Sequence, residues 1–301
     1  MFESLVAAAS VTGRTLVLPP PSAVSHNPKL FHETAVYCMA SLHGHAEFAS
    51  SPAPPEEAPN VASLQELLRW HAEGRRALPA DVILDPDSSR LSHFECLGLS
   101  GTAAARAARA VLALRLSTPY EDAAKAGLAR LGLVPGAFLS VHLRRGDFAT
   151  FRPETQHFGE SLVARVREAF RSEDDALPVL VACSVAPEER DPFPELSLGL
   201  GARRRVARTD DAYGVGEGVL HRCIVDGLML SMARRFVGTE DSTFSLGVWH
   251  LRAQARVARG SPSEPARTLD GVQSNAATTT APCWQRATSF GALLEYRASE
   301  K

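Results

Sequence analysis

The chain has 301 residues, enough to bury a sizeable core and most naturally to form two domains. Apolar residues make up 45% and charged residues 22% of it, which is typical of a globular protein and excludes a disordered one. A formal net charge of −2 gives no global electrostatic argument for a nucleic-acid or membrane partner, and no run of about 18 apolar residues predicts a membrane span.

Apolar strands alternate with helical stretches along the chain, which is the pattern of an α/β protein whose parallel sheet is covered on both faces. The opening residues 1–9 lack the basic segment of a signal peptide and predict an amphipathic helix, with a degenerate signal peptide as the alternative. The predicted strands are 15–18, 138–143, 179–182, 204–207 and 235–238. The predicted helices are 64–73, 103–116, 120–131, 160–171, 219–234 and a closing helix near 290–297.

Two domains are predicted, 1–132 and 133–301, because the informative half of the chain begins after the helix that ends near residue 131. Residues 50–59 are too rich in proline for regular structure, and residues 260–282 form a low-complexity segment. The five cysteines are widely spaced and form no C-x-x-C pair, which excludes the usual zinc spacings and leaves the redox compartment undecided.

The most informative stretch is 137–148, where an apolar strand ends in basic residues. His142 and Arg144 are two residues apart, so on an extended chain their side chains point to the same side. Arg144 offers a planar fork of donors to a phosphate, and His142 adds a second donor beside it. Arg145 points the opposite way, and we expect it to be a structural ion-pair partner.

A second apolar strand, ending near residue 238, leads into a hydroxyl-rich turn before a helix. Ser242 and Thr243 supply hydroxyls and backbone N–H groups, and Phe244 supplies an aromatic wall. Such a turn makes an anion-binding concavity, although the same residues also suit a capped helix start. Because ligands of open parallel sheets bind outside the carboxyl ends of the strands, the two strand ends predict a phosphate or nucleotide-sugar site.

Two other patterns are weaker. Asp85 and Asp87 form a D-x-D, but the intervening Pro86 and the following serines favour a turn over a metal site. The glycine-rich stretch 214–218 precedes a helix without following a strand in a compact βαβ unit, so a dinucleotide site is not favoured.

In their order and spacing, five segments resemble the protein O-fucosyltransferases, most closely the type that modifies thrombospondin repeats. Residues 142–148 match the family's H-x-R-R-x-D-F signature, and residues 236–245 match its F-[IV]-G-T-x-x-S-T-F-S signature. Between them lie a V-x-V-A strand and the helix that leads into the second signature, and an L-V-L-P-P segment lies near the start; these are 179–182, 224–234 and 16–20. The resemblance spans roughly residues 2–252 and is strongest from 138 to 245.

The resemblance implies a GT-B-like arrangement of two Rossmann-like domains with parallel sheets, the first lacking its first strand. It implies transfer of fucose from GDP-fucose to a serine or threonine hydroxyl of a protein acceptor, with inversion and with neither a metal nor a cofactor. A small disulfide-rich domain is a candidate acceptor. The resemblance also implies the lumen of the endoplasmic reticulum or Golgi, although this N-terminus shows no signal peptide.

The resemblance implies that Arg144 is the catalytic cation that stabilises the departing diphosphate. The GDP-fucose-binding residues that it implies are His142, Leu143, Arg144, Ser184, Ser242, Thr243 and Phe244. Asp226 lies on the helix before the second signature, and we expect it to be a structural anchor.

Two departures from the family pattern leave alternatives open. The family's glycine-rich N-terminal turn, which supplies a glutamate base in the thrombospondin-repeat type, is missing from this chain, so we expect a chain that is incomplete at its N-terminus or a degenerate one. Ser184 stands where the family strand usually has the aspartate of V-A-T-D, which puts guanine recognition in doubt. The alternatives are therefore a non-catalytic protein that binds a nucleotide or a protein, and a fucosyltransferase that acts on a glycan.

Overall fold

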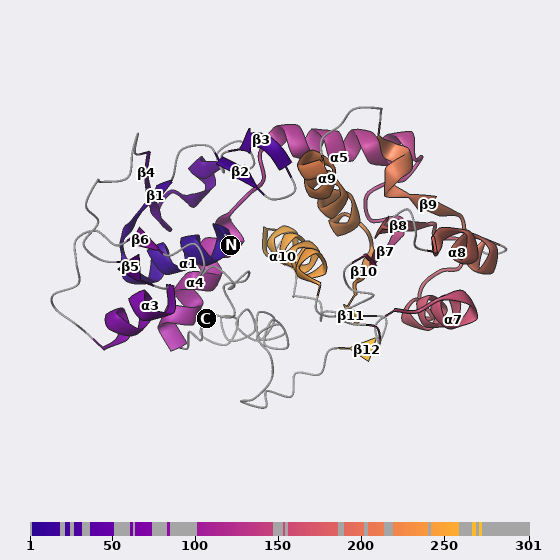
Figure 1. Cartoon of the computed structure of the whole chain (residues 1–301). Helices are drawn as coiled ribbons and strands as arrows, with labels where there is room; N and C mark the ends of the chain where they lie inside the picture. The colour runs from indigo at the N-terminus through magenta and orange to yellow at the C-terminus, as the bar shows by residue number, and fades with distance from the viewer. Residues whose placement is uncertain are drawn as a thin grey trace. The chain divides into compact units, whose positions relative to one another are not determined.

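The computed structural model of the chain describes residues 2–18, 22–24, 27–31, 37–50, 61–62, 64–73, 83–84, 101–146, 153, 156–185, 190–201, 204–213, 219–239, 242–258, 267–268 and 271–272. The described residues up to Ser117 form one compact unit, and those from Thr118 onward form a second (Figure 1). In this division the helix that starts at Thr118 belongs to the second unit, because it packs on other elements of that unit. Some predictions lie outside the described residues: the turn at 85–87, the stretches 51–59 and 214–218, the closing helix, and most of 260–282.

The first unit combines helices with short pairs of strands. Its elements are α1 (Phe2–Thr12), β1 (Thr15–Leu18), β2 (Ser22–Val24), β3 (Asn27–Phe31), η1 (Met39–Leu42), β4 (Glu47–Ser50), β5 (Val61–Ala62), α3 (Leu64–Ala72), β6 (Ile83–Leu84) and α4 (Gly101–Ala113). The pairs β1·β4 and β5·β6 are parallel, whereas β2 and β3 form an antiparallel pair. The predicted first helix and first strand are confirmed. The helix is not amphipathic along residues 6–11, because all six are buried where α1 packs on α3 and α4.

The second unit is a four-stranded parallel sheet between two layers of helices. Its elements are α5 (Thr118–Arg130), β7 (Leu139–Arg144), α7 (Gly159–Ala169), β8 (Val179–Ser184), α8 (Phe193–Leu200), β9 (Val206–Arg208), η5 (Thr209–Ala212), α9 (Val219–Ser231), β10 (Arg235–Val237), α10 (Thr243–Ala258), β11 (Arg267–Thr268) and β12 (Gly271–Val272). Helices α7 and α8 lie against one face, and α9 and α10 lie against the other (Figure 1).

The order of the strands in this sheet is β10-β7-β8-β9, and all the pairings are parallel. The chain runs from β7 outward through β8 to β9 and then returns to place β10 on the other side of β7. This is the 3-2-1-4 part of the Rossmann strand order, and the direction of winding reverses between β7 and β10. A ligand of such a sheet binds beyond the strand ends at that reversal.

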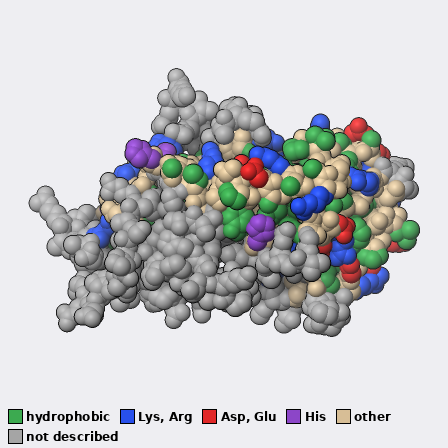
Figure 2. All heavy atoms as spheres, turned by 90° about the horizontal axis from the view of Figure 1, so that it is seen from above, with side chains coloured by type: hydrophobic (Ala, Val, Ile, Leu, Met, Phe, Trp, Pro, Cys, Tyr) green, Lys and Arg blue, Asp and Glu red, His purple; other side chains and the backbone are tan. Residues whose placement is uncertain are grey.

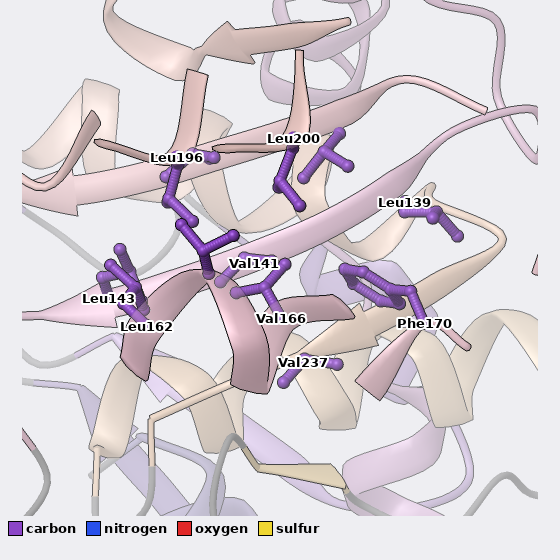
Figure 3. Packing of buried hydrophobic residues seen from close by; sticks show 12 residues of the cluster. Leu139, Val141, Leu143, Leu162, Val166, Phe170, Leu196, Leu200 and Val237 are labelled. Carbon is purple, nitrogen blue, oxygen red and sulfur yellow. The ribbon is translucent and has the colours of Figure 1, made fainter. Parts of the chain in front are cut away.

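The core of the second unit explains which side chains of β7 are left for a site. Leu139, Val141 and Leu143 point to one face and pack with residues of the two helices that cover it, as Figure 3 shows. The residues they pack with include Leu162 and Val166 of α7, Leu196 and Leu200 of α8, and Phe170, which directly follows α7. Because side chains alternate along a strand, Ser140, His142 and Arg144 belong to the opposite face. The Ser140 hydroxyl donates to the Leu230 carbonyl of α9 at 2.9 Å, which confirms that face.

Most predicted elements of this unit exist with shifted ends. The strand predicted at 204–207 forms at 206–208, because Arg204 is drawn away to the carbonyls that follow α7, including Asp174 O at 2.8 Å. Helix α8 was not predicted, and neither were the strands at 22–24, 27–31, 47–50, 61–62 and 83–84.

Two features bear on the environment of the chain. Within the described ranges, no helix has both the length and the apolar character needed to cross a bilayer. On the face of the second unit seen in Figure 2, basic and acidic side chains are interspersed, in keeping with the small net charge.

Candidate functional site

The carboxyl end of β7 carries the first half of the candidate site. His142 is buried, with 5% of its surface exposed, and Arg144 at the last position of the strand is half-buried. Leu143 between them is 2% exposed and belongs to the hydrophobic core, so only its backbone remains for a ligand. The alternation expected from the sequence is therefore observed: the basic pair points away from the core.

The second half is the connection from β10 to α10. Ser242 precedes the helix and caps its start: its hydroxyl accepts the Ser245 N–H at 3.4 Å and its carbonyl accepts the Leu246 N–H at 3.0 Å. Gly238 lies so close to the helix that a Cβ there would be 2.7 Å from the Ser245 Oγ. The capped helix start expected from the sequence is present, and a glycine permits the close approach.

Two contacts join the halves, and a third holds the turn of the second half together. The His142 Nδ1 lies 2.8 Å from the Ser245 Oγ, and the same oxygen accepts the Thr239 N–H at 3.0 Å. The Phe244 ring lies against the imidazole, with centroids 4.5 Å apart at 46°. His142, Phe244 and the turn before α10 therefore form one cluster at the reversal point of the sheet.

Burial makes His142 a neutral residue. Desolvation, and then the nearby Arg144 charge, lower its pKa to about 3. In the tautomer in which Ser245 donates to Nδ1, the ring proton would lie on Nε2. The positive charge at this strand end therefore comes from Arg144, beside a neutral His142.

Arg145 lies on the other side of the strand end, as expected, and it is buried. Its guanidinium donates to Gln156 Oε1 at 2.9 Å and to the His157 carbonyl, and it lies 4.1 Å from the centre of the Phe158 ring. These contacts hold the segment that leads into α7. Arg145 is thus a structural residue, bound to neutral groups of that segment.

Ser184 and Thr243 are placed by their backbones. Ser184 ends β8 directly opposite Arg144 in the parallel register, and Thr243 is the first residue of α10. The topology therefore brings the ends of β7 and β8 and the start of α10 to one edge of the sheet.

Asp226, predicted to be an anchor, bonds within its own unit. It lies on α9 and accepts the Tyr213 hydroxyl at 2.5 Å. Burial raises its pKa to about 6, and the hydrogen bonds from Tyr213 and Thr209 lower it in part. The charges of Asp226 and Arg144 both act on the thiol of Cys223, whose pKa is raised, chiefly by burial.

Three residues that were not predicted from the sequence support the site: Thr239 and Ser245 link its two halves, and Gln156 binds the end of β7. The first two lie inside the second signature and offered a signal, since a glycine followed by hydroxyl residues at a strand end suits close polar packing. Gln156 offered none, because its role depends on how the chain returns toward β7.

This edge of the sheet can hold an anion between the Arg144 guanidinium and the N–H groups at the start of α10. Arg144 supplies a full positive charge, and the start of α10 supplies N–H groups and the positive end of the helix dipole. A diphosphate carries the charge and the number of acceptor oxygens that such donors would satisfy.

Comparison with known proteins finds no matching family model and no matching curated protein. Among solved structures, the fold is similar to that of POFUT1, a protein O-fucosyltransferase. In complex with GDP, POFUT1 superposes with a TM-score of 0.57 and 15% identity, over 89% of this chain and 93% of that chain. In complex with GDP-fucose it superposes with a TM-score of 0.56 and 14% identity, over 89% and 92%. The chain therefore has the α/β, GT-B-like fold with parallel sheets that the sequence predicts.

Proposed function

We propose that this chain binds GDP-fucose at the carboxyl ends of β7 and β10 and acts as an O-fucosyltransferase-like glycosyltransferase. The observation that carries the proposal is the cluster of Arg144, His142 and the turn before α10 at the reversal point of the sheet. The similar fold of POFUT1, which is solved with GDP and with GDP-fucose, supports the choice of donor.

The reaction requires stabilisation of the leaving group. As the bond between fucose C1 and the β-phosphate oxygen breaks, negative charge grows on the diphosphate. An acceptor hydroxyl oxygen forms the new bond to C1 and gives up its proton to water, because no residue of the chain is assigned as the base. Arg144 and the donors at the start of α10 are preorganised for that charge, so a protein cation can do what a metal does in other transferases. On the resemblance alone we propose inversion at C1, a serine or threonine acceptor in a protein, with a small disulfide-rich domain as the candidate, and a secretory-pathway setting.

Calorimetric titration of the purified chain with GDP-fucose tests the donor. We expect micromolar binding of GDP-fucose and GDP and none of UDP-glucose. Arg144→Ala should weaken the binding and lower any transfer rate, each by about two orders of magnitude, or about 3 kcal/mol. Arg171→Ala is the matched control, because that side chain is 79% exposed in the same unit. If folded wild-type protein binds neither GDP compound, the proposal is wrong.

The second candidate is a binding protein without transferase activity. Ser184 favours it, since a serine brings no charge to the strand end where the family usually has an aspartate. Incubation with GDP-fucose and acceptor glycoproteins separates the two: binding without release of GDP supports this candidate, whereas GDP release that requires an acceptor supports the transferase.

A further inference from the structure

Thr239 lies where β10 separates from β7. The ladder between the two strands ends with Val237 opposite Val141, after which the chain turns toward α10. Beyond that point the backbone of β7 still has polar groups facing the departed strand. The Thr239 hydroxyl binds both of them: it donates to the His142 carbonyl at 2.9 Å and accepts the Arg144 N–H at 2.9 Å.

One hydroxyl thus replaces a missing residue of the ladder. Thr239 is 5% exposed, so water is a poor substitute for its hydroxyl. Buried backbone groups left without hydrogen-bond partners would destabilise the fold. The two groups that the hydroxyl binds, the His142 carbonyl and the Arg144 N–H, lie on either side of Leu143. These hydrogen bonds fix the strand backbone directly before the Arg144 side chain. A threonine suits this position because its branched side chain has few rotamers.

The other polar group of the Arg144 backbone is held from a different element. The Gln156 amide donates to the Arg144 carbonyl at 3.2 Å, and its oxygen accepts the Arg145 guanidinium at 2.9 Å. Side chains from two segments far apart in sequence therefore clamp both the N–H and the C=O of Arg144.

We propose that Thr239 is a positioning residue, which fixes the backbone of Arg144 so that the guanidinium is aimed at the diphosphate. This inference rests on the proposed function of Arg144. Because Thr239 acts through Arg144, its contribution to the affinity for GDP-fucose should vanish when the Arg144 guanidinium is removed. A residue that only stabilised the fold would affect binding equally with or without Arg144.

A double-mutant cycle tests this with Thr239→Val, which keeps the shape and removes both hydrogen bonds. We expect Thr239→Val to weaken GDP-fucose binding about tenfold and Thr239→Ser to stay within about threefold of wild type. In an Arg144→Ala background, with affinities followed into the millimolar range, Thr239→Val should have no further effect. Ser140→Ala is the matched control. It removes a buried hydroxyl from β7, the strand that carries Arg144, at a position away from Arg144, and it should lower stability without changing the affinity for GDP-fucose.

Hydrogen exchange of the Arg144 amide gives a readout that needs no ligand. We expect protection of this amide in wild type and in Thr239→Ser, and faster exchange in Thr239→Val, with the Leu139 amide unchanged as the reference. If wild type binds no GDP compound but the exchange behaves as expected, the proposed function fails and the positioning of the backbone stands. Unchanged exchange in Thr239→Val, or equal losses of affinity in both backgrounds, overturns the inference.

Discussion

Two titratable side chains near the site change the stability of the protein in opposite directions as the pH changes. The pKa of His142 is lowered to about 3, so between about pH 3 and pH 6.5 the unfolded chain binds more protons and stability rises with pH. The pKa of Asp226 is raised to about 6, so between about pH 4 and pH 6 the folded protein binds more protons and stability falls as the pH rises. The two contributions offset one another in the shared window.

A substitution of Asp226 separates its contribution to the pH dependence of stability from that of His142. Asp226→Asn keeps an oxygen for the Tyr213 hydroxyl and removes the charge that burial disfavours. We expect the variant to match wild type near pH 4 and to be more stable by about 2 kcal/mol at pH 7.5, from the size of the shift. Urea unfolding at both pH values measures the difference, in which the contribution of His142 cancels. A difference that does not grow between pH 4 and pH 6 would contradict the raised pKa.

At the scale of elements, glycines permit helices to pack closely on their neighbours. Helix α8 escaped prediction because its sequence contains Pro194 and Gly199, both poor helix formers. Proline is tolerated in the first turn of a helix, and a Cβ at Gly199 would lie 2.5 Å from Val163 on α7. The packing of α7 on α8, which pattern alone does not show, overrides the local preference.

The approach of β10 to α10 gives an element-scale prediction. Gly238→Ala would place a Cβ 2.7 Å from the Ser245 side chain, so the helix must move, and we expect a loss of about 1–3 kcal/mol of stability. Because Ser245 also holds His142, binding of GDP-fucose should weaken as well. Gly247→Ala on α10 is the control, because a Cβ at Gly247 would have nothing within 4 Å. We expect it to be neutral or to stabilise the protein by up to about 1 kcal/mol. Urea unfolding of both variants decides the matter, and equal stabilities would refute the close approach.

At the scale of the whole molecule, the residues proposed to bind the donor belong to the second unit. The 12 core residues of Figure 3 also lie between Leu139 and Val237 and are contributed by β7, β8, β10, α7 and α8 with their flanking residues. A unit that holds a core of its own in a sheet covered on both faces has the anatomy of an independent domain.

We therefore expect the fragment from Thr118 to Ser274 to fold alone and to bind GDP with an affinity within about tenfold of the full chain, since both its core and its candidate phosphate donors are internal. Circular dichroism during urea unfolding and calorimetry with GDP measure the two properties. A fragment without a cooperative transition would show that residues outside it contribute to its stability.

The sequence by itself determined the α/β class, most strands and helices of the second unit, and the side of β7 on which His142 and Arg144 lie. These follow from local periodicity, because a buried strand alternates its side chains whatever its neighbours are. Only the tertiary structure decided that β10 lies beside β7, that Thr239 and Gln156 hold the Arg144 backbone, and that His142 is neutral. Those properties depend on desolvation and on contacts between segments up to about a hundred residues apart, which no local pattern specifies.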